Sequence, residues 1–215
     1  ESLITDRTKA IVPVHLYGQC ADMEGILRIA QNHGLYVIED TAQAIGANYT
    51  FSDGDILKAG TMGQVGTTSF FPSKNLGCYG DGGAMLVNDD ELAGQIRMVA
   101  NHGQGKKYYH DIIGVNSRLD SIQAAVLRAK LPHLDDYAKA RRKVATAYDE
   151  AFAPIDRLET PKRHPMSSHV FHQYTLKTSG VDRDHMKNWL AERDVPSMIY
   201  YPVPLHKQKA YESYT

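Results

Sequence analysis

The fold class is decided by residues 10–40, which read AIVPVHLYGQCADMEGILRIAQNHGLYVIED. The run 10–18 is rich in β-forming residues and ends in glycine, which predicts a buried strand. Asp22 precedes apolar residues at helical spacing that stop near Gly34, which predicts a capped helix. Residues 35–40 are mostly apolar until a final acidic pair, which predicts a second strand. Strand, helix and strand form a βαβ unit of about thirty residues, so we expect the two strands to be parallel.

Beyond residue 40 the pattern predicts four more short strands, at 67–71, 84–87, 172–176 and 197–201. Helical patterns lie between them at 91–100, 117–151 and 184–193, and we expect the longest to bend at Pro132. The pattern of predicted elements changes after residue 103, to a long helix followed by a small α+β layer, which places a domain boundary near residue 115. We therefore predict an α/β fold, with part of a large, mainly parallel sheet domain at 1–114 and a long connecting helix with a small α+β domain at 115–215.

Composition and charge argue against several classes of function. The net charge is -1 with both signs interspersed, so we expect neither a nucleic acid nor a membrane as a partner. No apolar run approaches the length of a membrane span. Cys20 and Cys78 lie far apart without CxxC spacing, which favours a reducing compartment, the cytoplasm. The ten histidines are scattered and predict no metal site.

Two charged residues fall where an open parallel sheet binds ligands, at the carboxyl ends of strands. Asp40 ends the second strand, and it either caps a loop or faces a cationic group of a ligand. Lys74 follows the strand at 67–71, and it is either a surface residue or an amine that attacks an aldehyde. The lysine is followed by glycines that permit positive φ and close ligand approach, namely Gly77, Gly80, Gly82 and Gly83.

The segment around Lys74 suits a phosphate, since its glycine, serine and threonine residues offer backbone and hydroxyl donors. It contains neither GxxxxGK[ST] nor GxGxxG, which disfavours a nucleotide-binding loop. A phosphate, a cationic ring and an aldehyde together match pyridoxal phosphate (PLP), whose recurring partners are a lysine and an aspartate. A second interpretation is a lysine Schiff-base enzyme without a cofactor, such as an aldolase or decarboxylase. Asp40 together with Gln43 argues against it, because such a site needs no partner for a ring nitrogen.

Five blocks of the sequence resemble the DegT/DnrJ/EryC1/StrS family of sugar aminotransferases. Residues 37–47, VIEDTAQAIGA, look like the family segment EDxAQAxGA. Residues 69–84, which begin SFFPSKNLG and end GDGGA, resemble the family's lysine segment. Three shorter blocks also match, PVHLYG at 13–18, GVNSRLD at 114–120 and YPVPLH at 201–206. The blocks stand in the family's order across almost the whole chain.

The resemblance implies the aspartate-aminotransferase-like fold of PLP enzymes, fold type I, with a three-layer large domain and a small α+β domain. It implies that PLP forms an internal aldimine with Lys74 and that Asp40 pairs with the pyridine nitrogen. Gln43 matches the glutamine that hydrogen-bonds the phenolic oxygen, and Ser69 matches the phosphate-binding serine.

The same resemblance implies a homodimer with shared active sites, because Asn116 matches an asparagine that reaches the phosphate of the neighbouring subunit's cofactor. A turn residue before the Ser117 cap is the alternative role for Asn116. His172, Tyr201 and His206 fall in blocks that the family places near the substrate, although each taken alone fits a structural role as well.

The family's reaction moves an amino group from L-glutamate to a nucleotide-linked 3- or 4-keto deoxysugar, for surface polysaccharides or glycosylated antibiotics. Some relatives dehydrate the sugar instead and carry histidine at the lysine position, so Lys74 favours transamination. Family members also carry an earlier segment with a Gly-Thr/Ser-Ala phosphate turn and an aromatic residue that stacks on the ring. This sequence holds no counterpart, so we expect part of a longer protein with an incomplete site. A non-catalytic fragment or regulatory relative that keeps the fold is the alternative function.

Overall fold

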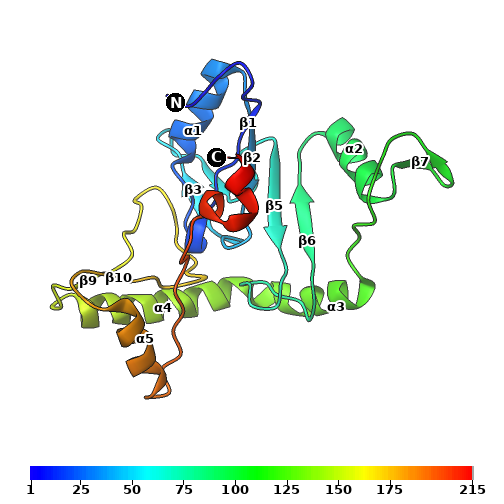
Figure 1. The fold of residues 1–215 in the computed structure, drawn as a ribbon. Helices are drawn as coiled ribbons and strands as arrows, with labels where there is room; N and C mark the ends of the chain where they lie inside the picture. Colours follow the sequence, from blue (N-terminus) through cyan, green and yellow to red (C-terminus); the bar gives the residue numbers. More distant parts are fainter. Residues whose placement is uncertain (215) are drawn as a thin grey trace. The chain divides into compact units, whose positions relative to one another are not determined.

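The computed structural model describes residues 1–214, which form two compact units along the chain (Figure 1). The first unit comprises residues 1–148 and 162–174, and the second comprises 149–161 and the chain from 175 onward. Within the described residues no helix has the length and apolar character needed to cross a membrane. The domain boundary predicted near residue 115 stays a prediction.

A four-stranded sheet organises the first unit in the order β1-β2-β5-β6 (Figure 1). The strands are β1 (Ala10–Ile11), β2 (Tyr36–Asp40), β5 (Val65–Ser69) and β6 (Gly83–Leu86). β1, β2 and β5 run parallel, whereas β6 is antiparallel to β5. The predicted parallel βαβ unit is therefore confirmed, and the carboxyl ends of β2 and β5 meet at one edge.

The helix of this βαβ unit, α1 (Met23–His33), begins and ends as its sequence predicts. Asp22 accepts a hydrogen bond from Gly25 N at 3.3 Å, and Gly34 closes the helix in the left-handed conformation at φ 62°. The strand predicted at 10–18 is much shorter, because β1 ends at Ile11 and a 3-10 turn occupies Leu16–Gly18. Two backbone properties of that segment explain the difference, the missing N–H of Pro13 and the positive φ of Tyr17 and Gly18.

The remaining strands of the first unit form two antiparallel hairpins. β3 (Asn48–Thr50) pairs with β4 (Ile56–Lys58), and β7 (Gln104–Lys106) pairs with β8 (Tyr109–His110). Between β6 and β7 lies α2 (Asp90–Ala100), capped by Asp89. The helix and the strand β6 were predicted, whereas the two hairpins were not.

The long helical pattern after residue 117 is interrupted once. α3 (Ser121–Lys130) passes through a 3-10 turn at Leu131–His133 into α4 (Leu134–Phe152). Pro132 has no N–H to donate and its ring crowds the preceding turn, so the chain changes its helical pitch where the sequence predicts a bend.

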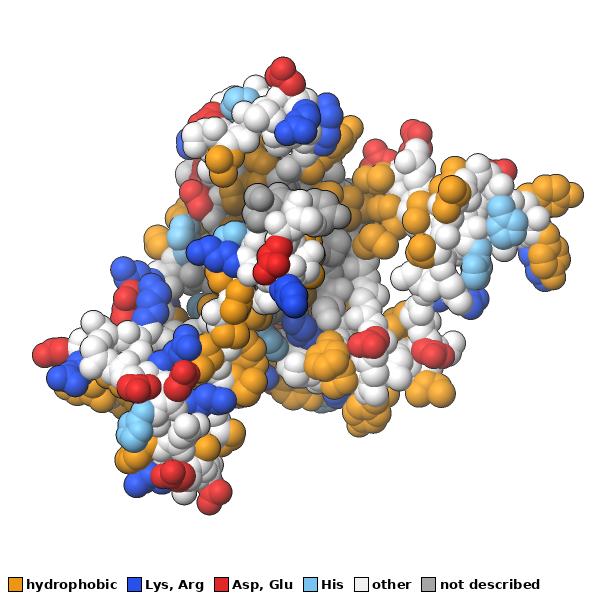
Figure 2. Space-filling model, in the orientation of Figure 1, with side chains coloured by type: hydrophobic (Ala, Val, Ile, Leu, Met, Phe, Trp, Pro, Cys, Tyr) orange, Lys and Arg blue, Asp and Glu red, His pale blue; other side chains and the backbone are white. Residues whose placement is uncertain are grey.

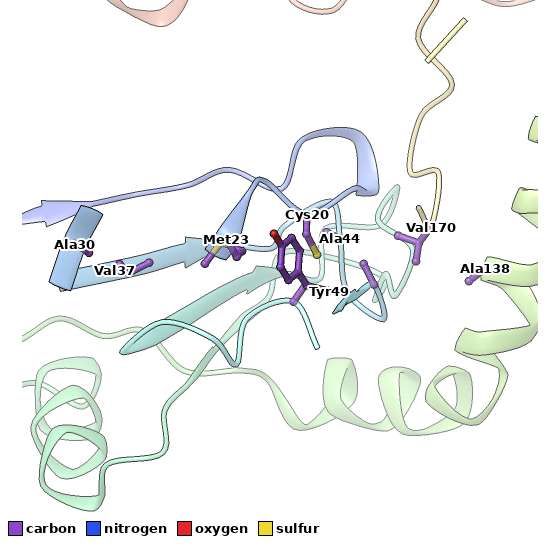
Figure 3. Close-up of a cluster of buried hydrophobic side chains, with 10 residues drawn as sticks. Cys20, Met23, Ala30, Val37, Ala44, Tyr49, Ala138 and Val170 are labelled. Carbon is purple, nitrogen blue, oxygen red and sulfur yellow. The ribbon is translucent and has the colours of Figure 1, made fainter. Parts of the chain in front are cut away.

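The main hydrophobic core of the first unit gathers side chains from distant parts of the chain. Tyr49 lies beside Cys20 (Figure 3), and its ring meets Phe51 edge-on at 5.0 Å between centroids. Its hydroxyl donates to Asp22 Oδ1 at 3.1 Å, so this buried tyrosine also holds the start of α1. The buried members are Cys20, Met23, Ala30, Val37, Ala44, Ala47, Tyr49, Ala59, Ala138 and Val170.

The second unit contains less regular structure. β9 (Leu158–Glu159) pairs antiparallel with β10 (Lys177–Thr178), followed by α5 (Arg183–Ala191) and 3-10 turns at Leu205–Lys207 and Lys209–Tyr214. The helix predicted at 184–193 is thus confirmed.

Two predicted strands are absent from the described chain, at 172–176 and 197–201. Before the first of them, Val170 N donates to Gly18 O at 2.8 Å, and within it Gln173 N donates to Tyr17 O at 3.4 Å. The backbone there is bonded to a loop and not to a ladder of strands. A segment of alternating polarity forms a strand only where a neighbouring strand supplies partners for its backbone hydrogen bonds.

Candidate active site

The carboxyl ends of β2 and β5 bring Asp40 and Ser69 to one edge of the sheet. Asp40 is the last residue of β2 and pairs in register with Thr67 of β5. Ser69 ends β5 two residues further in the same direction. Thr41 N donates to Thr67 O at 2.7 Å, which joins the two strands just beyond Asp40. Ligands of open parallel sheets bind at this kind of edge.

Lys74 follows β5 on a tight turn. Its backbone N donates to Phe71 O at 2.8 Å, which sets the turn. The chain returns closely at Gly77, where a Cβ would lie only 2.4 Å from Pro72 O. The Lys74 side chain is half-buried, and its Nζ makes no hydrogen bond or ion pair with any residue in the described chain. An amine in this state is available to a carbonyl compound.

Only one oxygen of the Asp40 carboxylate is hydrogen-bonded within the described chain. Oδ1 accepts a hydrogen bond from Ala42 N at 3.0 Å, which is the loop-capping role. Within residues 1–214, Oδ2 accepts no hydrogen bond. The carboxylate is half-buried, so a cation that reached Oδ2 would be only partly screened by water.

Gln43 fastens the turn after β1 to the edge of the sheet. This buried side chain accepts a hydrogen bond from Tyr17 N at 2.6 Å through Oε1. Tyr17 has a φ of 60°, a left-handed conformation that needs support in a residue other than glycine. The amide of Gln43, three residues beyond Asp40, therefore holds the 3-10 turn at 16–18 in place.

Ser69 keeps its hydroxyl hydrogen for another acceptor, because its Oγ accepts from Phe71 N at 3.3 Å. The glycines after Lys74 do not use their conformational freedom, since none of the four has a positive φ. Their contribution is close packing of the backbone, as at Gly77. Cys78 is buried among them and donates through Sγ to Phe70 O at 3.0 Å.

His172 is oriented by the residue next to Lys74. Asn75 Nδ2 donates to Val170 O at 3.2 Å, so its Oδ1 faces His172 Nδ1, also at 3.2 Å. An amide oxygen only accepts, so Nδ1 carries the hydrogen and Nε2 keeps its lone pair. Arg141 Nη1 donates to the carbonyl oxygens of Phe171 and His172, which fixes the backbone.

His172 is neutral at physiological pH. Burial, followed by the charges of Lys74 and Arg141, lowers the pKa of His172 from its usual 6.5 to about 4. The imidazole therefore adds no positive charge near Lys74 and offers an acceptor at Nε2.

This low pKa makes the stability of the chain depend on pH. Between about pH 6.5 and about pH 4 the unfolded histidine binds a proton that the folded one does not, so the free energy of unfolding falls as the pH falls through this window. His172→Gln, which does not titrate, is expected to remove this part of the slope. Urea unfolding of both proteins at pH 7, 6 and 5 measures it. Parallel pH profiles for the two proteins would contradict the assignment.

Asn116 lies on another part of the first unit. It is exposed, and its Oδ1 accepts from Arg118 Nε at 2.9 Å. It lines a hollow of about 1050 Å³ bounded by β5, β6, α2 and residues 116–119. Across the described residues, no hydrogen bond joins it to Asp40, Gln43, Ser69 or Lys74. Its expected role at a neighbouring subunit's phosphate stays a prediction.

Tyr201 and His206 belong to the second unit and are exposed there. His206 stands in the 3-10 turn Leu205–Lys207. The substrate-binding roles expected of Tyr201 and His206 stay predictions.

Sequence reasoning did not single out the buried acid beside Asp40. Glu39 and Val37 occupy the same face of β2 and are 0% and 1% exposed. Alternation along a strand places residues 37 and 39 on one side, and an acid on a buried side requires partners. That signal was available in the sequence. It does not identify the partner, because His15, which binds Glu39, comes from another segment, as does His172, which binds Asn75.

Comparison with known proteins decides the family. Residues 1–215 match the model of the DegT/DnrJ/EryC1/StrS aminotransferase family. The chain belongs to this family. The resemblance carried by the five sequence blocks is thereby confirmed.

Two curated relatives in the DegT/DnrJ/EryC1/StrS family bear different names. The "Pleiotropic regulatory protein" of Geobacillus stearothermophilus is 51% identical over 215 residues, covering 99% of this chain and 56% of the relative. The UDP-N-acetyl-3-dehydro-alpha-D-glucosamine 3-aminotransferase of Acidithiobacillus ferrooxidans is 48% identical over 211 residues, covering 98% and 55%. The chain therefore spans about half the length of these relatives.

Solved structures agree with the family assignment. DesV of S. venezuelae, in complex with a ketimine intermediate, matches with a TM-score of 0.90 and 43% identity, covering 98% of this chain and 55% of that one. NtdA of Bacillus subtilis, with bound cofactor PMP, matches with a TM-score of 0.84 and 32% identity, covering 97% and 47%. The fold is that of the DegT-family aminotransferases, which depend on PLP.

Proposed function

We propose that the full-length gene product is a PLP-dependent aminotransferase that moves an amino group from L-glutamate to a nucleotide-linked 3- or 4-keto deoxysugar. The observation that carries the proposal is the shared sheet edge. There Lys74 offers an unpaired amine, Asp40 an oxygen without a hydrogen bond in the described chain, and Ser69 a hydroxyl hydrogen. The nucleotide-sugar aminotransferase among the relatives supports the substrate class.

The donor set at this edge fits PLP. An anionic oxygen suits a protonated ring nitrogen, an amine suits an aldehyde, and a hydroxyl at the end of a strand suits a phosphate. Lys74 would hold the aldehyde carbon, Asp40 the ring nitrogen and Ser69 the phosphate. When bound, PLP supplies an electron sink for the carbanion that forms at the substrate Cα.

The protein's own residues would then bind, orient and move protons. Asp40 holds the proton on the ring nitrogen by its charge. The Lys74 amine would serve as the base and acid that removes and returns the proton at the substrate Cα. Neutral His172 would add no charge next to Lys74 and would offer Nε2 as a hydrogen-bond acceptor there.

A homodimer with shared sites belongs to the same proposal. Asn116 follows the β7–β8 hairpin, which carries the exposed side chains of Tyr108 (77%) and Tyr109, and the exposed Ile113 (98%) lies between the hairpin and Asn116. Figure 2 shows hydrophobic side chains gathered over this hairpin. Exposed aromatic and apolar side chains of this kind are typical of protein contacts. The three-layer large domain is proposed from the four-stranded sheet and the likeness to solved family structures. The free, buried Cys20 and Cys78 support a cytoplasmic setting.

A regulatory role is the second candidate, because a relative that is 51% identical is named a pleiotropic regulatory protein. The two functions make different demands on the same edge. A regulator needs to bind the cofactor or the sugar without turnover, whereas an aminotransferase must exchange the amino group.

The test is spectroscopic. The full-length gene product is incubated with PLP, and we expect a yellow species that borohydride bleaches while fixing the cofactor on the Lys74 peptide, read by mass spectrometry. L-glutamate should bleach the yellow species, and one member of a nucleotide-ketosugar panel should restore it with release of an aminosugar. A yellow protein that glutamate leaves unchanged would favour the regulatory candidate, and a protein that stays colourless would exclude both PLP roles.

A further inference from the structure

A hydrogen-bonded pair of side chains, His15 and Glu39, lies wholly inside the first unit next to Asp40. His15 Nε2 and Glu39 Oε2 are 2.9 Å apart, and both side chains are 0% exposed. His15 Nδ1 accepts a hydrogen bond from Ala21 N at 3.1 Å, so the ring hydrogen sits on Nε2 and is donated to Glu39. Neither side chain reaches the edge where the cofactor is proposed to bind, so the reaction itself leaves this pair unexplained.

The Glu39 carboxylate is held by four donors. Oε2 accepts from His15 and, at 2.8 Å, from Gly60 N, while Oε1 accepts from Met62 N and Gly63 N at 2.6 Å each. Burial alone raises the pKa of Glu39, but the hydrogen bonds from His15 and the three backbone groups outweigh it and hold the pKa below its ordinary value of 4.5. Glu39 is therefore an ion at neutral pH.

The three backbone donors come from one turn that glycine makes possible. Gly60 has a φ of 89°, and a Cβ at Gly63 would lie 2.6 Å from Val37 O. A Cβ at Gly60 would also approach Thr41 Cγ2 at 3.1 Å, so the turn packs against the residue that follows Asp40. The carboxylate and the turn at 60–63 therefore fix each other's position.

The pair also controls the backbone of Asp40. His15 N donates to Asp40 O at 3.0 Å, and Asp40 N donates to Pro13 O at 2.9 Å. Thr67 Oγ1 donates to Glu39 O at 3.0 Å from the other side of the strand. Successive residues of a strand point to opposite faces, so anchoring the Glu39 side chain fixes the direction in which the Asp40 side chain leaves β2.

A buried carboxylate is a poor way to gain stability alone, because taking its charge out of water is costly even where hydrogen bonds compensate for it. The pair of His15 and Glu39, fully hydrogen-bonded, does specify one geometry. We propose that His15, Glu39 and the turn at 60–63 form a positioning device that aims the Asp40 carboxylate at the cationic ring nitrogen of the cofactor. The proposal rests on the proposed function, and His15 and Glu39 are positioning residues that touch neither cofactor nor substrate.

The test separates orientation from stability. Glu39→Gln keeps the shape of the side chain but sets an NH₂ group against backbone N–H donors. Val37→Ala is the matched control, because it leaves a cavity on the same face of the same strand. In the full-length gene product, we expect Glu39→Gln to weaken PLP affinity roughly 10- to 100-fold, the range found when outer partners of a metal ligand are removed. We also expect an altered visible circular dichroism of the bound cofactor. Val37→Ala should unfold at lower urea yet keep the affinity and the dichroism of the wild type.

A second pair of variants covers the case in which Glu39→Gln does not fold. His15→Gln keeps an N–H near the position of Nε2, whereas His15→Leu removes it, so the dichroism should stay near the wild type in the first and change in the second. If the wild type binds PLP and Glu39→Gln or His15→Leu behaves like Val37→Ala, the positioning role is overturned. If the wild type binds no PLP, the proposed function fails first, and the two failures are distinguished.

Discussion

Replacing Lys74 with arginine is expected to reduce transamination at least roughly 10³-fold, the largest loss that a single substitution should cause in this protein. Arginine keeps the positive charge and the length of the side chain. Its guanidinium stays protonated, so it neither forms a Schiff base nor serves as a base. The yellow species should disappear, and borohydride should leave no cofactor on the peptide that contains residue 74.

Lys58→Arg is the matched control for this result. Lys58 is an exposed lysine of β4 that donates to Asn48 Oδ1 at 3.2 Å, and arginine keeps a donor there. Its turnover and its absorbance should equal those of the wild type. Borohydride fixation that persists in Lys74→Arg would move the reactive amine to another lysine and remove Lys74 from the proposed role.

Asp40→Asn is expected to have the second largest effect. The amide keeps the acceptor for Ala42 N but loses the charge that we propose holds a proton on the ring nitrogen. Removing one electrostatic partner of the charge that develops during a reaction costs about 10²- to 10³-fold in turnover, and we expect a loss in this range. Because Lys74 is intact, the yellow species should still form.

The control for Asp40→Asn is Asp53→Asn. Asp53 Oδ1 accepts from Asp55 N at 3.0 Å, the same i to i+2 turn that Asp40 makes with Ala42, but on an exposed loop. Turnover of Asp53→Asn should match the wild type. Full turnover of Asp40→Asn in single-turnover and steady-state assays would show that its charge has no part in the reaction.

The parts of the fold that depend on local chemistry could be predicted from the sequence. The Asp22 cap, the Gly34 stop and the apolar strand at 36–40 each follow from residues close to one another along the chain. Parallel pairing followed from the βαβ arrangement, and with it the place of Asp40 at a carboxyl edge.

The parts that depend on distant partners could not be predicted. Residues 172–176 alternate like a strand. The backbone at 170–173, however, is hydrogen-bonded to Tyr17, Gly18 and Arg141 and not to a neighbouring strand. Likewise no local pattern connects His15 with Glu39, or Asn75 with His172. The sequence indicates that a buried acid needs partners, but it does not say which segment supplies them.

The return of residues near 170 to the first unit has a consequence for how the chain folds. Cys20 N donates to Ser167 Oγ across 147 residues, and Asn75 Nδ2 donates to Val170 O across 95. Contacts this distant carry a large loop-closure entropy and slow the folding of a domain. A nascent chain can build α1 and β2 early, but the segments that carry Cys20 and Asn75 gain these restraints only after residues 167 and 170 have left the ribosome. Lys74, next to Asn75, is thus in place late, when most of the unit around it already exists.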